Sequence, residues 1–193
     1  MRKIPRELEN PIYNFIVTLI DPLCPIFKKL HFTPNIITTL SLITGMFSAY
    51  FLYKSNVIVF SVLFLLSYIF DCMDGYYARK YDMVTRAGDI YDHIKDTLVL
   101  ILVLTVFIYK NKNNIAVVIV SLIIMSLSLV LMLSFFGCQE RIYNKSDSPT
   151  LSFTKRFCPD TSMIKLLKFF GSATIIFVFI FIVVFVEKSM QGR

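Results

Sequence analysis

Five long runs of apolar residues, separated by polar links, account for most of this chain of 193 residues. A helix needs about 20 mainly apolar residues to cross the hydrocarbon core of a membrane. Each run is close to that length, and together they cover roughly residues 35–53, 56–79, 88–109, 113–136 and 168–187. The sequence therefore predicts an all-α integral membrane protein: a bundle of five transmembrane helices, or six if part of 138–167 also crosses the membrane.

The segment before the first run differs in character. Residues 8–30 mix aliphatic and aromatic side chains with charges and prolines, which is typical of an amphipathic helix lying in the membrane interface. We expect residues 1–33 to form a cytosolic N-terminus with this interfacial helix, and residues 34–193 to form the transmembrane domain. The layout is not that of a cleavable signal peptide, so we expect the segment to be retained.

Topology explains the excess of basic residues. The chain has a formal net charge of +7, but its lysines and arginines stand beside the apolar runs instead of forming one basic face. This pattern argues against a nucleic-acid partner. If the N-terminus is cytosolic and the five runs alternate in direction, most basic residues fall in cytosolic segments, in agreement with the positive-inside rule. The link 78–88 between the second and third runs then lies on the cytosolic side.

Four cysteines are scattered along the chain: Cys24, Cys72, Cys138 and Cys158. They form no CxxC pair and have no histidine-rich segment beside them, which argues against a zinc or redox site. We expect four unpaired thiols in a reducing compartment.

Four aspartates stand inside the second and third apolar runs. Ionisable residues are costly to place in a spanning helix and usually mark function. A helix turns by about 100° per residue, so each of these two helices presents two carboxylates beside small residues. The two stripes are Asp71 and Asp74 with Gly75 and Ala78 on the second helix, and Asp92 and Asp96 with Gly88 on the third.

The two pairs of carboxylates are predicted to meet. Both lie one to two turns inside the cytosolic boundary, and the short link between the helices makes them neighbours. Four carboxylates at one place repel one another unless cations bring in positive charge. A pair of divalent ions is the simplest solution, and all-oxygen ligation favours Mg²⁺ or Mn²⁺. With Arg79 available for phosphate, this arrangement suits displacement at phosphorus.

The order and spacing of these residues resemble the signature of the CDP-alcohol phosphotransferase family, also called the CDP-alcohol phosphatidyltransferase family. The signature is matched at every fixed position and reads in this chain Asp71-x2-Asp74-Gly75-x2-Ala78-Arg79-x8-Gly88-x3-Asp92-x3-Asp96. A looser resemblance runs from about Asn10 through the third run and includes "TPNIIT" at the start of the first.

The resemblance implies a membrane enzyme of phospholipid synthesis. Such an enzyme transfers a substituted phosphate from a CDP-alcohol, of the CDP-diacylglycerol or CDP-choline/ethanolamine type, to an acceptor alcohol and releases CMP. By matching position, Asp71, Asp74 and Asp92 bind two Mg²⁺ or Mn²⁺ ions with Asp96 also near them, and Asp96 is the general base. The resemblance also implies a homodimer among membrane lipids. The residues implied to bind the CDP-alcohol are Asn35, Thr38, Gly75, Ala78, Arg79, Thr85 and Gly88.

Two departures from the family's pattern concern the fold and the substrate. Members usually have six spans, whereas this chain has five apolar runs, so either part of 138–167 spans or the chain is shortened. Relatives that use a phosphorylated acceptor often carry arginine three residues after the threonine of "PNxxT", where this chain has Ser41. Ser41 therefore argues against glycerol phosphate. The "DHIKD" at 92–96 is closer to the "DHxxD" of choline and ethanolamine phosphotransferases than to the "DPxxDK" of phosphatidylglycerophosphate synthases.

Some residues have two interpretations. His93 either assists the base or faces a neighbouring helix as a bystander. Lys95 either holds a substrate phosphate or extends toward the cytosol. Asp82 and Asp89 are expected to be solvated loop or cap residues.

Two other classes of function compete with the transferase. A carrier or ion transporter would use the intramembrane carboxylates, but transporters tend to show repeats and midplane sites, whereas these acids lie near one face and no repeat is visible. A catalytically inactive membrane scaffold is the other alternative, and the intact motif argues against it.

Overall fold

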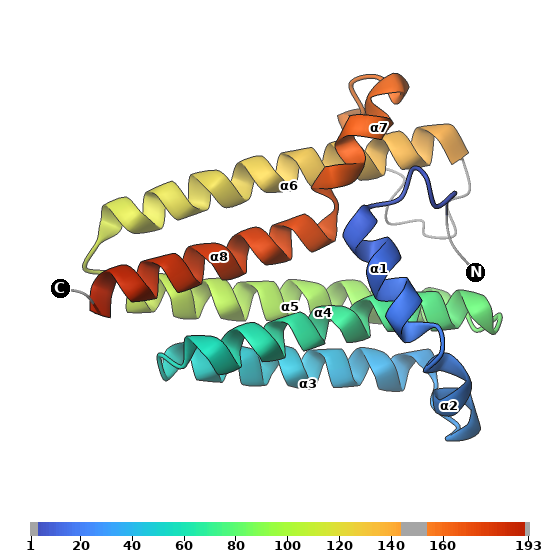
Figure 1. Ribbon diagram of the computed structural model, residues 1–193, viewed down its shortest axis with the longest axis horizontal. Coiled ribbons are helices and arrows are strands. Elements are labelled where there is room, and N and C mark those ends of the chain that lie inside the picture. The colour runs from blue at the N-terminus through green and yellow to red at the C-terminus, as the bar shows by residue number, and fades with distance from the viewer. Residues whose placement is uncertain (1–3, 144–153, 192–193) are drawn as a thin grey trace.

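The computed structural model describes residues 4–143 and 154–191, whose helices form an elongated bundle (Figure 1). Five of the described helices are long, and the short ones lie before α3 and between α6 and α8. The long helices are α3 (Pro34–Tyr53), α4 (Val57–Lys80), α5 (Arg86–Lys110), α6 (Ile115–Tyr143) and α8 (Ser172–Gln191). The short ones are α1 (Pro11–Ile20), α2 (Cys24–Lys29), η2 (Thr161–Met163), α7 (Ile164–Leu167) and η3 (Lys168–Phe170).

Side-chain caps fix where the first three long helices begin. Thr33 accepts a hydrogen bond from the backbone N–H of Ile36, and Pro34 occupies the first turn of α3. The Asn56 and Thr85 side chains accept the corresponding bonds at the starts of α4 and α5. Such caps satisfy backbone donors that have no partner within the helix. The links between the apolar runs are therefore short and well defined.

Small residues on α3 let this helix pack against both α4 and α5. Ser41, Gly45 and Ser48 are buried on the packed face of α3. A methyl group added at Gly45 would lie 2.8 Å from Cγ2 of Val99 and 3.0 Å from Oγ of Ser67. Gly45 therefore lets α3 lie close to both α4 and α5.

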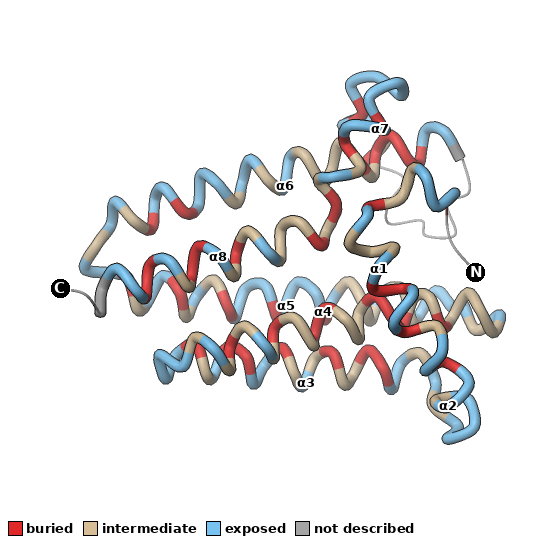
Figure 2. Tube along the Cα trace, viewed as in Figure 1, coloured by how far each residue is buried: buried red, intermediate tan, exposed pale blue. Residues whose placement is uncertain are grey.

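The C-terminal helix closes the bundle over α4 and α5. The ring of Phe179 on α8 packs edge-on against Phe60 and Phe64 of α4 and against Phe107 of α5. The helix α6 packs on α8 and is exposed along much of its length (Figures 1 and 2). In a membrane protein such an apolar outer surface faces lipid.

The helices of the described ranges confirm the prediction of an all-α membrane protein. Within the described ranges, four helical stretches are long and apolar enough to cross a membrane: α3, α4, residues 115–142 and residues 161–189. The helix α5, also predicted to span, falls outside this group because its first half carries the aspartates and Lys95. Between 154 and 170 the structure contains only short helical turns, and residues 144–153 of the predicted loop lie outside the described ranges.

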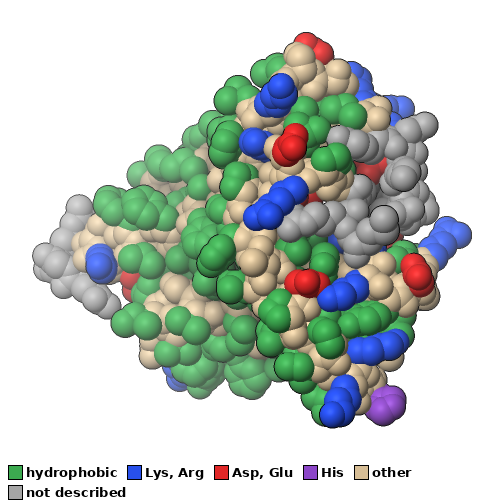
Figure 3. Space-filling model, turned by 45° about the vertical axis from the view of Figure 1, so that its right-hand side comes forward, with side chains coloured by type: hydrophobic (Ala, Val, Ile, Leu, Met, Phe, Trp, Pro, Cys, Tyr) green, Lys and Arg blue, Asp and Glu red, His purple; other side chains and the backbone are tan. Residues whose placement is uncertain are grey.

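Charged side chains are unevenly distributed over the surface. On the face drawn in Figure 3, hydrophobic side chains cover much of the bundle, and most charged side chains gather toward the end formed by the N-terminal helices and α7. The ends of α4 and α5 that carry the signature motif lie toward this same end (Figure 1).

The N-terminal segment is tied to α4 through Asp21. The predicted interfacial helix is broken into α1 and α2, and Asp21 lies at the break. Its carboxylate is 2.5 Å from Nζ of Lys80 and accepts a hydrogen bond of 2.8 Å from the Tyr76 hydroxyl. These bonds hold the pKa of Asp21 below its ordinary value.

This lowered pKa predicts a small loss of stability in acid. A carboxylate whose pKa is lower in the folded state stabilises the fold above its unfolded pKa of about 4, and this contribution disappears as the pH falls through the folded pKa. Asp21 is half-exposed, so we expect an effect of about 1 kcal/mol or less. Between pH 5 and 2 the melting temperature of the wild type should fall more than that of Asp21→Asn. Parallel curves for the two proteins would contradict this role of Asp21.

The prediction of four unpaired thiols is wrong for two of them. Cys138, near the end of α6, forms a disulfide with Cys158, while Cys24 and Cys72 are free and buried. The two chain segments are in direct contact here, because a methyl group at Gly137 would collide with the backbone oxygen of Thr154. Spacing along the sequence does not reveal this contact.

Candidate active site

The motif aspartates of α4 and α5 lie together beneath the link that joins these helices. Asp74 is buried, and its Oδ2 accepts a hydrogen bond of 2.7 Å from the Thr38 hydroxyl of α3. Asp71 and Asp92 are partly exposed, and the side chain of Asp96 is about half exposed, at 52%. The carboxylates of α4 and α5 thus form one cluster, as the spacing predicted, and α3 adds the Thr38 hydroxyl.

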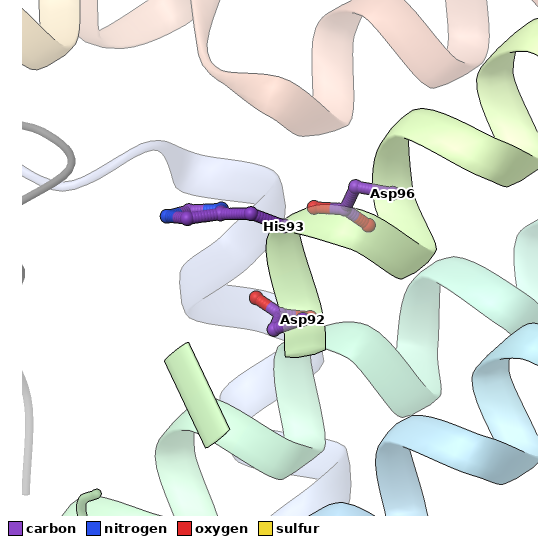
Figure 4. Close-up of side chains that lie close together, drawn as sticks. All are labelled: Asp92, His93 and Asp96. Carbon is purple, nitrogen blue, oxygen red and sulfur yellow. The ribbon is translucent and has the colours of Figure 1, made fainter. Parts of the chain in front are cut away.

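The geometry of the cluster suits a divalent cation. Asp71, Asp74 and Asp92 each offer a carboxylate oxygen, and these atoms lie within 4.8 Å of one another. Asp92, His93 and Asp96 form a second group with the same property. Figure 4 shows how these last three side chains lie on adjoining turns of α5. The oxygen donors of the first group fit Mg²⁺ or Mn²⁺, which prefer carboxylate ligands.

The ammonium of Lys95 lies inside the carboxylate cluster. Its Nζ forms a close ion pair with Oδ1 of Asp71 and lies 3.1 Å from Oδ1 of Asp92 and 2.6 Å from Oδ1 of Asp96. Only 1% of the side chain is exposed. Of the two interpretations of Lys95, extension toward the cytosol does not fit the structure, because the carboxylates hold the ammonium in the interior.

The glycine at the start of α5 leaves room beside α3. Thr85 accepts the backbone N–H of Gly88 at 3.0 Å. A methyl group at Gly88 would lie 3.0 Å from Oγ1 of Thr85 and 3.1 Å from Oδ1 of Asn35. The structure thus brings together three of the residues expected to bind the CDP-alcohol, and Thr38 is one helical turn further along α3.

The remaining motif residues lie on the last turns of α4. Gly75 lies beneath the guanidinium of Arg79, because a methyl group there would be 3.2 Å from Nη1. Nη2 of Arg79 donates a hydrogen bond of 3.2 Å to the Tyr13 hydroxyl of α1. Ala78 is partly buried on the same turn. The arginine is therefore oriented in part by α1, which the sequence pattern did not predict.

A pocket of about 260 Å³ adjoins the cluster. It shares Arg79 and Asp92 with the motif, and α1, α6 and the start of α8 complete its wall. Sequence reasoning missed the α6 residues, although a polar pair that follows a long apolar run was a usable signal. The lining residues from outside the motif include Glu9, Tyr13, Asp89, Phe135, Gln139 and Glu140.

Asp82 and Asp89, which are not fixed residues of the signature, differ in their surroundings, and His93 lies near Asp89. Asp82 is exposed in the link between α4 and α5, as expected. Asp89 is only 22% exposed, lies 3.8 Å from Nε2 of His93, and lines the pocket together with it. His93 therefore faces the pocket, and Asp89, expected to be a solvated loop or cap residue, lies in the first turn of α5 and is only partly exposed.

Comparisons with known proteins agree with the motif. The model of the CDP-alcohol phosphatidyltransferase family matches residues 31–190. An uncharacterized protein of Aquifex aeolicus (strain VF5) is 35% identical over 96 residues, which cover 50% of this chain and 47% of that relative. The aligned part therefore spans about half the length of the relative. No solved structure matches the chain.

Proposed function

Because the chain belongs to the CDP-alcohol phosphatidyltransferase family, we propose that it transfers the substituted phosphate of a CDP-alcohol to an acceptor alcohol and releases CMP. The family implies a transferase of phospholipid synthesis in the membrane. The observation that carries the proposal for this chain is the approach of Asp71, Asp74 and Asp92, whose oxygens lie within 4.8 Å of one another.

In the proposed reaction the acceptor hydroxyl oxygen attacks the phosphorus that carries the alcohol of the donor. The new bond is an oxygen–phosphorus bond, and the bond from that phosphorus to the oxygen of the CMP phosphate breaks. CMP leaves with that oxygen, and the hydroxyl proton passes to a carboxylate. We assign this general-base role to Asp96, whose partly exposed carboxylate is accessible beside the more enclosed cluster.

Asp71, Asp74 and Asp92 are the proposed metal ligands. A Mg²⁺ or Mn²⁺ ion held by these carboxylates would supply positive charge to the phosphates of the donor. The Thr38 hydroxyl orients Asp74 through its hydrogen bond, which is the usual way in which outer residues position a metal ligand.

The remaining motif residues are assigned to the CDP-alcohol. Arg79 binds a phosphate through its guanidinium, a group well suited to phosphate oxygens. The small residues let the nucleotide approach the backbone, and the polar residues contact it. These residues are Asn35, Thr38, Gly75, Ala78, Thr85 and Gly88.

The orientation, assembly and domain division of the protein are also part of the proposal. Arg79, Lys80 and Arg86 flank the link between α4 and α5, which supports a site facing the cytosol. We infer that residues 1–33 act as an interfacial segment in front of the transmembrane domain at 34–193. The family resemblance supports a homodimer.

We propose further that the acceptor alcohol carries no phosphate of its own. Among the described residues, the pocket beside the cluster is lined by three carboxylates that are not assigned to the metal, Glu9, Asp89 and Glu140, but by a single arginine, Arg79. In this proposal Arg79 already binds a phosphate of the CDP-alcohol. A second phosphate would then face an excess of negative charge at short range, which opposes its binding.

A CMP-release assay tests these proposals together. The purified protein in lipid nanodiscs with Mg²⁺ is given CDP-diacylglycerol, CDP-choline or CDP-ethanolamine, each with diacylglycerol, phosphate-free polar alcohols or glycerol phosphate. We expect CMP from at least one pair that lacks a phosphorylated acceptor. CMP release with glycerol phosphate as the only active acceptor would contradict the proposal of a phosphate-free acceptor. It would still support the proposal that the protein is a transferase. If no pair releases CMP, while an active member of the family does so in parallel, the proposal that the protein is a transferase is wrong.

A further inference from the structure

The disulfide between Cys138 and Cys158 lies directly behind the wall of the pocket. It joins the last turns of α6 to the chain just before η2. The next two residues of α6, Gln139 and Glu140, line the pocket, and so does Phe135, less than one turn before Cys138. The bond therefore fixes the part of α6 that faces the site, although neither the motif nor the proposed reaction uses it.

Only a small apolar cluster supports the chain at this disulfide. Its buried members within the described ranges are Phe135, Cys138, Cys158, Ile164 and Leu167. It is separate from the two larger clusters of the bundle, and residues 159–163 are all exposed. A segment with few buried contacts opens locally at low cost. The disulfide is therefore a main constraint that keeps this segment on α6.

The same segment is connected to a second part of the pocket wall. The backbone oxygen of Lys168, which follows α7, accepts a hydrogen bond of 2.7 Å from Nδ2 of Asn10. Nζ of Lys168 donates another, of 2.8 Å, to the backbone oxygen of Glu7. Asn10 and Glu9 line the pocket. Through η2, α7 and η3, the disulfide is thus linked to the N-terminal residues of the wall as well as to α6.

The proposed orientation of the protein places this disulfide in the cytosol. The described chain beside it is basic, which agrees with a cytosolic position, and its basic residues are Lys155, Arg156, Lys165 and Lys168. Cytosolic thiols are kept reduced, and the disulfides that do form there are usually transient, catalytic or redox-sensing. A disulfide at the wall of the pocket in this compartment therefore suits regulation better than permanent stabilisation.

We propose that the Cys138–Cys158 bond is a reversible redox switch of the site. Two thiol groups of a cellular reductant supply two electrons and two protons: the sulfur–sulfur bond breaks, two cysteine thiols form, and the thiols of the reductant become a disulfide. Because both cysteines are buried, the exposed segment 159–163 must open before a sulfur is attacked. In the reduced form the wall is less fixed and binds the acceptor alcohol more weakly. This inference rests on the proposed function and on the cytosolic orientation.

A redox titration tests the switch without any substrate. The protein in nanodiscs is equilibrated with mixtures of reduced and oxidised glutathione, up to the ratio found in the cytosol, and free thiols are then alkylated and located by mass spectrometry. We expect Cys138 and Cys158 to change from a bonded pair to two thiols within this range, and to pair again when the mixture is reversed. A bond that survives every mixture would be a permanent structural disulfide and would overturn the inference, as would thiols that never pair.

The CMP-release assay measures the effect on the site. The KM for the acceptor should be about 3–10-fold higher in reduced than in oxidised wild type, the equivalent of about one lost hydrogen bond, while kcat changes less because the motif lies on α4 and α5. Cys138→Ser should behave like the reduced form and no longer respond to glutathione. Cys24→Ser is the matched control, because this buried thiol is free, and it should respond like wild type. Equal KM values in the two forms of wild type would contradict the switch.

Trypsin separates this inference from the proposed function. Arg156 is exposed beside Cys158, so cleavage after it should be several-fold faster in the reduced protein, and equal cleavage rates would contradict the loosening of the wall. Redox-dependent cleavage without any CMP release would support the redox-dependent wall and contradict the transferase. CMP release with the same KM in both forms would support the transferase and contradict the switch.

Discussion

Replacement of Asp96 by asparagine is expected to lower the rate of CMP release by about 10²–10⁴-fold, the usual contribution of a general base. Asparagine has nearly the same size but cannot take the proton of the acceptor hydroxyl. Asp71, Asp74 and Asp92 remain in the variant, so the CDP-alcohol should still bind with a Kd close to that of wild type. Single-turnover CMP release and calorimetric titration of the CDP-alcohol measure the two quantities separately.

Asp82→Asn is the matched control for this experiment. It makes the same chemical change in the link between α4 and α5, where Asp82 is exposed and has a positive φ of 52°. Asparagine tolerates this backbone conformation, so the control should keep its activity. If Asp96→Asn releases CMP at a rate within a few-fold of the control, Asp96 is not the general base.

Replacement of Lys110 by methionine should cause a large loss of stability without touching the carboxylate cluster. At the end of α5 far from that cluster, Nζ of Lys110 pairs with Oε1 of Glu187 on α8, and only 11% and 8% of the two side chains are exposed. Removal of one partner leaves a buried charge without its counterion, which costs about 3–5 kcal/mol. The midpoint of unfolding in nanodiscs or mild detergent should fall accordingly.

Two comparisons identify the cause of that loss. Lys112→Met makes the same change two residues later at an exposed position and should be nearly neutral. The double variant Lys110→Met/Glu187→Leu removes both charges and should recover much of the loss, because an apolar pair can replace a buried ion pair. If the double variant is as unstable as Lys110→Met, the ion pair is not the source of the effect.

The positions of the long helices were largely predictable from the sequence. The apolar runs at 35–53 and 56–79 correspond to α3 and α4 to within about one residue at each end. The N-caps Thr33 and Asn56 explain the agreement at the starts of these helices, since each defines the residue at which a helix begins. The motif likewise predicted that Asp71, Asp74 and Asp92 would converge, because helical periodicity and a short link determine that geometry.

Packing against other segments decided the features that the sequence did not predict. The helix α6 continues to Tyr143, beyond the apolar run that ends near 136, and its last turns carry the disulfide to Cys158. The helix α8 begins at Ser172, later than predicted, because η3 and Gly171 precede it. Neither feature has a periodic signal, since each depends on contacts between segments distant in sequence.

The burial of Lys95 has the same origin. A lysine near the end of a spanning helix ordinarily extends toward water. Here the carboxylates of two helices surround its ammonium, and only the relative placement of α4 and α5 reveals that. The pocket beside it also includes Gln139 and Glu140 of α6, outside the signature, where the only signal was a polar pair after a long apolar run.

The most direct test of the central claim is phosphorus NMR of the purified protein with the CDP-alcohol and acceptor pair selected by the CMP-release assay. The account predicts that the diphosphate signals of the donor disappear while equal amounts of CMP and a new phosphodiester appear, and that this conversion needs Mg²⁺ and stops with EDTA. CMP formation that continues unchanged in EDTA, or release of CMP without a phosphodiester product, would contradict metal-dependent transfer at the Asp71, Asp74 and Asp92 cluster.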